Sequence, residues 1–160
     1  MQKHPAGIPG CPESKARQIK EKKRENEMIL VIGGFHQGKT AFARRLAAGG
    51  GKTGEVEADI AEADGRSASP EEALHAEVVL GFHHYIKRLL QSGQDTETFV
   101  RQIIEADPRV VVMTEVGYGI VPMEADERQY REAVGKAGQM LATQAESVYR
   151  LVCGIGTKIK

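Results

Sequence analysis

The 160-residue sequence predicts an α/β fold with a small, mostly parallel sheet flanked by helices, and three apolar runs separated by helical periods carry the prediction. Residues 28–32 and 109–114 are almost continuously apolar, as in parallel strands that helices cover on both faces. Residues 147–152 form the last predicted strand. Because strands that alternate with helices pair in parallel, and because this length suits one core, we expect residues 28–160 to form a single domain.

Residues 1–27 precede that domain, and we expect them to form a mobile charged tail or a short solvated helix. They hold three prolines, the charged run 20–25, and seven Lys and Arg against four acids. A segment of this composition has little apolar surface to bury in a core. A basic arm that touches an anionic partner is the alternative.

The composition excludes several classes of function. The formal net charge is zero, so no global field attracts nucleic acid or a membrane surface. No apolar stretch approaches the roughly 20 residues that span a bilayer, and the N-terminus lacks the apolar region of a secretory signal. Cys11 and Cys153 have no metal-ligand spacing and indicate a reducing compartment. We therefore expect a cytoplasmic protein with no nucleic-acid or membrane partner.

Residues 33–40, Gly-Gly-Phe-His-Gln-Gly-Lys-Thr, fit the pattern G-x-x-x-x-G-K-[ST] between the first strand and a helix over residues 40–47. The order strand, glycine loop, helix predicts a phosphate-binding loop and a P-loop nucleotide-binding fold. Glycines let several N–H groups point at one anion, and the helix N-terminus adds partial positive charge. The predicted nucleotide-binding residues are Gly33, Gly34, Phe35, His36, Gln37, Gly38, Lys39 and Thr40.

Within this loop, Lys39 is expected to reach the β- and γ-phosphates of ATP or GTP, and the Thr40 hydroxyl is expected to hold a Mg²⁺ ion. His36 is expected to contact solvent or nucleotide rather than to act as a base. The alternative is an ordinary glycine-rich turn between a strand and a helix.

The first helix ends at residues 49–51, and residues 55–60 are a candidate for a short edge strand. One amphipathic helix is then predicted from residue 70 to about residue 91. Ser69, Pro70 and Glu72 form a helix start with a capping box, and apolar residues recur at spacings of four and three. The alternative is a strand at residues 78–80, against which Gly81 and the unbroken helical period argue.

Two more helices complete the predicted elements. Asp95 or Thr96 caps a helix that stops before Pro108, and a long helix runs from about residue 126 to about residue 146.

The loop after the second apolar strand is the other candidate site. Ligands of open parallel sheets bind at the carboxyl ends of the strands, and Glu115 directly follows such an end. Its carboxylate could hold Mg²⁺ through water or orient a substrate hydroxyl, whereas the alternative is a cap on a neighbouring backbone N–H. Gly117 and Gly119 suit a backbone that passes close to a ligand or that turns with positive φ.

Two other pairs of residues are candidates. Arg128 and Arg131 lie three apart on one helix face, where they could meet phosphate or simply face solvent. His83 and His84 could carry a covalent phosphoryl or nucleotidyl group. Adjacent helical residues point about 100° apart, so at most one of the two histidines can face a site.

Four stretches together carry a family resemblance: residues 33–40, the Glu-Val-Gly-Tyr-Gly-Ile-Val-Pro run at 115–122, and residues 128–135 and 153–160. They resemble the adenosylcobinamide kinase / adenosylcobinamide-phosphate guanylyltransferase family of cobalamin biosynthesis, over residues 28–48 and about 108–160. The resemblance implies phosphorylation of the aminopropanol hydroxyl of (adenosyl)cobinamide, followed by GMP transfer through a guanylylated histidine. It also leaves a homo-oligomer open, because longer members are oligomers.

Carried over by position, the resemblance implies catalytic roles for Lys39 and Glu115. It implies that residues 33–40 hold the triphosphate and Mg²⁺, with Thr40 on the metal, and that residues 115–122 line the active-site crevice. The candidate residues of the substrate crevice are therefore Glu115, Gly117 and Gly119, together with Arg128 and Arg131. Residues 49–70 contain no histidine to match the guanylylated one, so kinase activity has more support than guanylyl transfer. A nucleotide-binding or regulatory relative without transferase chemistry is the alternative, and a nucleic-acid-binding ATPase has only the basic tail in its favour.

Overall fold

A computed structural model describes residues 28–49, 60–117, 119 and 124–160, so the predicted tail and residues 55–59 of the candidate edge strand lie outside the described residues. The described elements, in chain order, are β1 (Ile29–Gly33), α2 (Lys39–Ala47), β2 (Glu62–Asp64), α3 (Pro70–Leu74), β3 (Val78–Leu80), α4 (Phe82–Gln91), α5 (Thr96–Ala106), β4 (Val110–Thr114), α6 (Ala125–Gln144), β5 (Ser147–Val152) and β6 (Ile155–Lys158).

The strands form one six-stranded sheet in the order β2-β3-β4-β1-β5-β6. Each neighbouring pair is parallel except β5 and β6, which are antiparallel. The first strand therefore lies inside the sheet, with Ile29 opposite both Val110 of β4 and Ser147 of β5. The predicted α/β fold with a mostly parallel sheet is confirmed.

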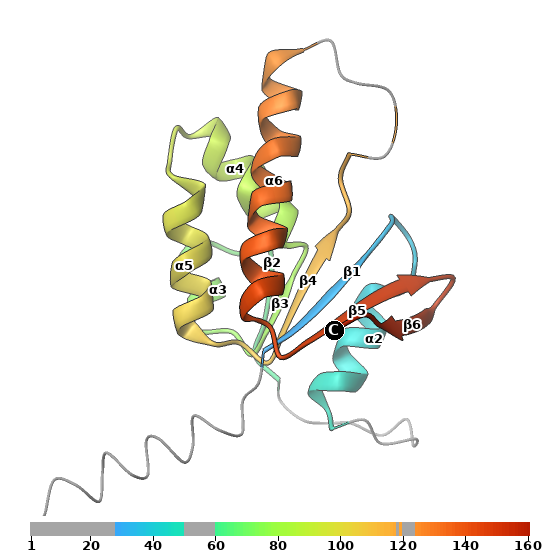
Figure 1. Cartoon of the computed structure of the whole chain (residues 1–160). Coiled ribbons are helices and arrows are strands. Elements are labelled where there is room, and N and C mark those ends of the chain that lie inside the picture. Colours follow the sequence, from blue (N-terminus) through green and yellow to red (C-terminus); the bar gives the residue numbers. More distant parts are fainter. Residues whose placement is uncertain (1–27, 50–59, 118, 120–123) are drawn as a thin grey trace, which may run out of the picture.

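Helices cover both faces of this sheet. On one face, Leu30, Val79 and Val111 pack with residues of α4, α5 and α6. On the other face, Val31 and Val112 pack with α2 through Ala43 and Ala47 (Figure 1). Successive residues of one strand thus enter different apolar clusters, which explains why the strand sequences are continuously apolar rather than alternating.

The single helix predicted from residue 70 to residue 91 is wrong. The capping box at Ser69 and Glu72 forms, but α3 ends at Leu74 and residues 78–80 form β3. This strand fills the sheet between β2 and β4, and its three side chains are almost fully buried. Gly81 has φ 59°, a left-handed conformation that ends the strand and begins α4. Burial of Val78 and Val79 on both faces outweighs the helical period, which only α4 uses.

Two short strands were also missed. Ile60 is not in a strand, and β2 is instead the three residues Glu62–Asp64, which carry two acids and little apolar pattern. The antiparallel strand β6 is exposed, so it too lacks an apolar signature. Both depend on the neighbouring strand for their conformation.

Lys160 ties the last residues back to α6. Its Nζ donates to the carbonyl oxygens of Ala142 at 2.9 Å, Thr143 at 3.0 Å and Ala145 at 2.6 Å. The last carbonyls of a helix have no partner inside the helix, and a cation there also meets the negative end of the helix dipole. This side chain therefore stabilises the end of α6 beside β5.

Lys160→Met should lower the free energy of unfolding by about 1 kcal/mol, because three carbonyl groups lose a charged donor. Urea denaturation measures the change. The control is Lys158→Met, an exposed lysine of β6, which should change stability by less than about 0.5 kcal/mol. Equal losses in the two variants would contradict this capping role.

Candidate functional site

The candidate site lies along the edge of the sheet where the parallel strands end. β1 continues into residues 33–40, called the glycine loop from here on, and β4 continues into Glu115. Next to them, β3 leads through Gly81 into the first turn of α4, and β2 ends at Asp64. Residues distant in the sequence therefore meet at one edge, as the order of the strands requires (Figure 1).

The first glycine of the loop is required by a close backbone approach. Gly33 has φ 153°, and a Cβ atom there would lie 2.6 Å from the carbonyl oxygen of Leu151 in β5. Gly38 has φ 82° and is the N-cap of α2, which has no side-chain cap and no acid in its first turn. Unpaired N–H groups and the positive end of the helix dipole therefore remain available to an anion at this point.

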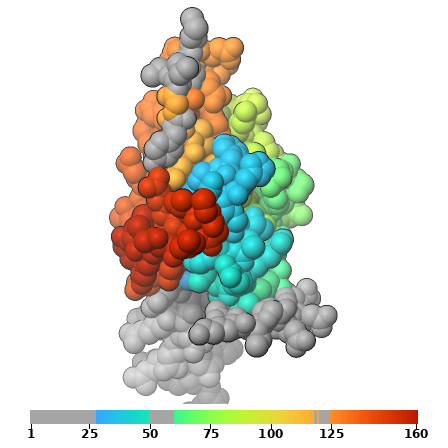
Figure 2. Space-filling view, turned by 90° about the vertical axis from the view of Figure 1, so that its right-hand side faces the viewer, coloured from blue at the N-terminus to red at the C-terminus, as the bar shows by residue number. Residues whose placement is uncertain are grey.

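The turn between β5 and β6 holds the glycine loop in place. The Cys153 N–H donates to Gln37 Oε1 at 2.5 Å, and the Gly154 N–H donates to the Gln37 carbonyl oxygen at 3.1 Å. In Figure 2 this C-terminal hairpin, in red, lies against the blue and cyan surface of the N-terminal elements. The two glycines among residues 153–156 indicated a turn, but the sequence did not show that this turn contacts the glycine loop.

Gly156 serves the same contact from β6. A Cβ atom there would lie 2.4 Å from the ring of Phe42 in α2, so glycine makes room for that ring. The Phe42 ring also packs against Tyr149 of β5, with centroids 5.4 Å apart.

Lys39 is folded back across the glycine loop. Its Nζ donates to the carbonyl oxygen of Gly34 at 2.5 Å, and only 9% of the residue is exposed. Burial lowers the pKa of the Lys39 ammonium, while the negative charge of Glu115 opposes that change. Lys39 and Glu115 therefore lie within electrostatic reach of each other, as their placement at two strand ends predicted.

Glu115 is paired with a residue that the sequence did not suggest. Its carboxylate lies 3.2 Å from Arg150 Nε on β5, and its side chain is 17% exposed. The Glu115 N–H donates to the Gly33 carbonyl oxygen at 3.1 Å, which continues the pairing of β4 with β1. The structure thus fixes the carboxylate beside the glycine loop through an ion pair and a backbone bond.

The remaining predicted residues are placed as follows. Gly117 and Gly119 have φ 127° and 136°, so a positive φ is confirmed, and an added Cβ would meet no described atom within 4 Å. Close approach to a described residue is therefore not the reason for glycine at either position, and approach to a ligand stays a prediction. Arg128 and Arg131 lie in the first two turns of α6, and their contact with phosphate stays a prediction.

His83 is the site residue that sequence reasoning undervalued. Its Nδ1 accepts the N–H of Thr114 at 3.3 Å, and its ring lies edge-on to Phe35 of the glycine loop with centroids 6.0 Å apart. The adjacent ring of His84 is 4.0 Å away. Once β3 is recognised as a strand, His83 is only three residues from the carboxyl edge of the sheet, but the predicted continuous helix hid that position.

Charged residues from β2 extend this edge. Asp64 Oδ1 accepts the N–H of Arg66 at 2.9 Å, and Glu62 forms two 2.7 Å bonds to Arg44 of α2. A cavity of about 470 Å³ lies between these residues and Leu80. Sequence patterns did not predict the contact between β2 and α2.

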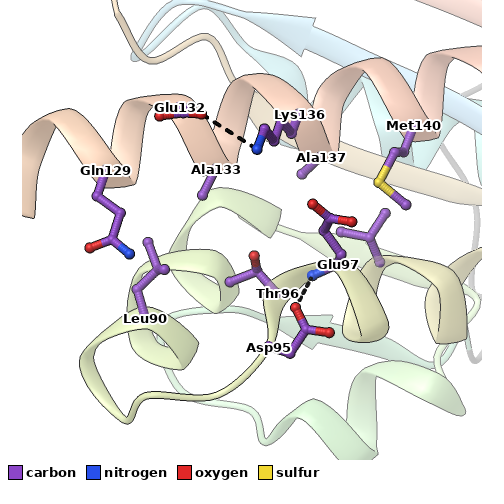
Figure 3. Close-up of a pocket in the computed structure, with 11 residues that line it drawn as sticks. Leu90, Asp95, Thr96, Glu97, Gln129, Glu132, Ala133, Lys136, Ala137 and Met140 are labelled. Atoms are coloured by element: carbon purple, nitrogen blue, oxygen red, sulfur yellow. Dashed lines mark hydrogen bonds and ion pairs between the residues drawn. The ribbon is translucent and has the colours of Figure 1, made fainter.

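A second cavity, of about 230 Å³, lies elsewhere, between α6 and the start of α5 (Figure 3). Three of its charged side chains have local partners. Asp95 accepts the N–H groups of Glu97 and Thr98, and Lys136 lies 3.4 Å from Glu132. The edge at the carboxyl ends of the strands is therefore the better candidate site.

Within the described part of the chain, no group of three or more His, Cys, Asp or Glu residues could hold a metal ion by itself. No helix among the described elements has the length and apolar content needed to cross a bilayer.

These features define an α/β protein with an open, mostly parallel sheet, whose candidate ligand site is the edge formed by the glycine loop and the ends of β3 and β4. The family model for cobinamide kinase / cobinamide phosphate guanyltransferase matches residues 74–159, more than half of the chain, and the chain belongs to this family. The match begins at residue 74, upstream of residue 108, from which the sequence motifs alone suggested the family. It does not include the glycine loop.

Two curated relatives are both described as bifunctional adenosylcobalamin biosynthesis protein CobU, one from Salmonella typhimurium strain LT2 and one from Escherichia coli strain K12. Each is 47% identical over 51 residues, which is 32% of this chain. The aligned region covers only 28% of each relative.

Gly33→Ala should destabilise the protein by about 2 kcal/mol or more, because the new Cβ meets the Leu151 carbonyl and the backbone conformation disfavours it. Gly135→Ala is the matched control. It lies in α6 with nothing within 4 Å of an added Cβ, so it should stabilise by about 0.5–1 kcal/mol. Thermal and urea unfolding measure both changes, and a harmless Gly33→Ala would contradict the close packing of β1 on β5.

Proposed function

We propose that this protein is a phosphotransferase of cobalamin biosynthesis that transfers the terminal phosphate of ATP or GTP to the aminopropanol hydroxyl of (adenosyl)cobinamide. The observation that carries the proposal is the position of Lys39, buried at the uncapped start of α2 and bonded across the glycine loop to Gly34. Membership of the cobinamide kinase / guanyltransferase family supports the choice of acceptor.

The glycine loop would bind the nucleotide through its backbone and through Lys39. The uncapped N-terminus of α2 offers N–H groups and a partial positive charge to the phosphates. When a triphosphate enters, Lys39 would exchange the Gly34 carbonyl for a phosphate oxygen. This partner is stronger because it carries full negative charge. The bonds from Cys153 and Gly154 to Gln37 would keep the loop in shape during that exchange.

The described residues fit a Mg²⁺ ion only together with the phosphates. Mg²⁺ commonly takes one or two protein oxygens and completes its coordination with phosphate oxygens and water. Thr40, in the first turn of α2, would supply a hydroxyl oxygen, and Glu115 a carboxylate through water. The ion would neutralise phosphate charge.

Glu115 is the residue proposed to orient the acceptor hydroxyl. It follows β4 at the same edge as the glycine loop, and its charge acts on Lys39. Positioning and electrostatic stabilisation supply most of the catalysis in phosphoryl transfer, so a held carboxylate beside the phosphates suits the reaction. Its pairing with Arg150 fixes the carboxylate from the side of β5.

A second candidate function is nucleotide binding without transfer. One observation favours it: β3 ends at Leu80 and is followed by Gly81, so no carboxylate directly follows this strand. Guanylyl transfer has less support. The lone pair of His83 Nδ1 already accepts the Thr114 N–H, so the proton of the neutral ring is on Nε2. Neither nitrogen then has a free lone pair with which to attack a nucleotide phosphate.

Lys39→Ala should reduce transfer of labelled γ-phosphate to cobinamide by at least about 10²-fold, because the cation that meets the phosphates is lost. The control is Lys136→Ala, an exposed lysine of α6 that should leave transfer unchanged. Thin-layer separation of labelled cobinamide phosphate measures the rate. Binding of ATP or GTP by calorimetry with turnover at background in the parent protein would instead favour the non-catalytic function, and no binding would overturn both.

A further inference from the structure

We propose that His83 donates a hydrogen bond from Nε2–H to the terminal phosphate of the bound nucleotide and so lets the site distinguish a triphosphate from a diphosphate. The inference rests on the proposed nucleotide binding by the glycine loop. His83 would act as a neutral donor, not as a nucleophile.

The hydrogen bond from Thr114 determines the tautomer. The backbone N–H of Thr114 donates to His83 Nδ1 at 3.3 Å, so Nδ1 must present its lone pair. A neutral imidazole carries its single proton on the other nitrogen. Nε2 is therefore an N–H donor.

That donor has no partner among the described residues. His83 is only 4% exposed, and its Nε2 is buried without a hydrogen bond. A buried donor without an acceptor is costly, and native structures rarely keep one without a reason. A ligand oxygen that reaches Nε2 would satisfy it.

The strand order places His83 near the glycine loop. β3 and β4 pair only as far as Val79 and Val111, and beyond that point the His83 ring takes the Thr114 N–H that faces β3. Thr114 is itself opposite Gly33 of β1, where the glycine loop begins. The imidazole therefore lies one strand away from the loop.

One ring contact and one electrostatic interaction join His83 to this loop. Phe35 lies edge-on to the imidazole at 6.0 Å, and the charge of Lys39 affects His83. Phe35 is 62% exposed, so few protein contacts hold its side chain in place when a ligand enters. His83 is also in the first turn of α4, whose N-cap Gly81 offers no side-chain cap. That helix end adds partial positive charge beside the donor.

Burial and the surrounding charges keep the imidazole neutral. Burial lowers the pKa of His83 to about 4, and the positive charges of His84, Lys39 and Arg66 act in the same direction while Asp64 opposes them. At neutral pH the side chain therefore remains a donor without adding a second cation beside Lys39.

Two substitutions of His83 distinguish the role of the Nε2–H donor from that of the hydrogen bond between Thr114 and Nδ1. His83→Asn keeps an oxygen near Nδ1 for the Thr114 N–H but removes the distal donor. His83→Gln places an amide N–H near the position of Nε2. The control is His84→Asn, which changes the adjacent, more exposed histidine.

Calorimetry with Mg²⁺ should give the affinities of each full-length variant for ADP and for a non-hydrolysable ATP analogue. We expect the preference for the triphosphate to fall about tenfold in His83→Asn, as for loss of one bond to a charged acceptor. It should stay within about threefold of the parent in His83→Gln and His84→Asn. The ¹⁵N and ¹H resonances of His83 Nε2–H should shift with the ATP analogue and not with ADP.

An unchanged preference in His83→Asn, or the same resonance shift with both nucleotides, would overturn the role of His83 while leaving the proposed function intact. A parent protein that binds neither nucleotide would overturn the proposed function, and this inference with it.

Discussion

The candidate site depends on β1 lying inside the sheet, between β4 and β5. The parallel pairing of β1 with β4 places Gly33 opposite Thr114, so the glycine loop and Glu115 leave the sheet side by side. The pairing with β5 is so close at Gly33 that a side chain there would meet the Leu151 carbonyl. Lys39 and Glu115 are 76 positions apart in the sequence, and this strand order brings their charges within electrostatic reach of each other.

The C-terminal hairpin gives the glycine loop a fixed neighbour. The bonds from Cys153 and Gly154 to Gln37 join the loop to the β5–β6 turn, and Gly156 admits the ring of Phe42 from α2. The loop is thus held from the side opposite His83. Gly156 is required by packing against the Phe42 ring, whereas Gly154, like Gly117 and Gly119, has a positive φ. The same residue type has two physical explanations in one chain.

Residues 69–91 contain one feature that sequence patterns predicted correctly and one that they did not. The capping box at Ser69 formed because its bonds are local, between residues three apart. The helix predicted beyond it failed because Val78 and Val79 gain more from burial inside the sheet than from continuing a helix. That error also concealed the position of His83 at the candidate site, because this position follows from the end of β3 at Leu80. Arg150, the partner of Glu115, was missed because an exposed strand residue has no local sign of its partner.

The sequence by itself determined the three apolar strands, the glycine loop between a strand and a helix, and the family resemblance, because each is a local pattern of residue types. The family membership found by comparison agrees with that resemblance over residues 108–159 and extends it upstream to residue 74. Only the tertiary structure decided which residues border the loop: Arg150 beside Glu115, Gln37 bonded to the hairpin, and His83 bonded to Thr114. The physical reason is that strand order and register join distant segments, and neither is encoded in a short stretch of sequence.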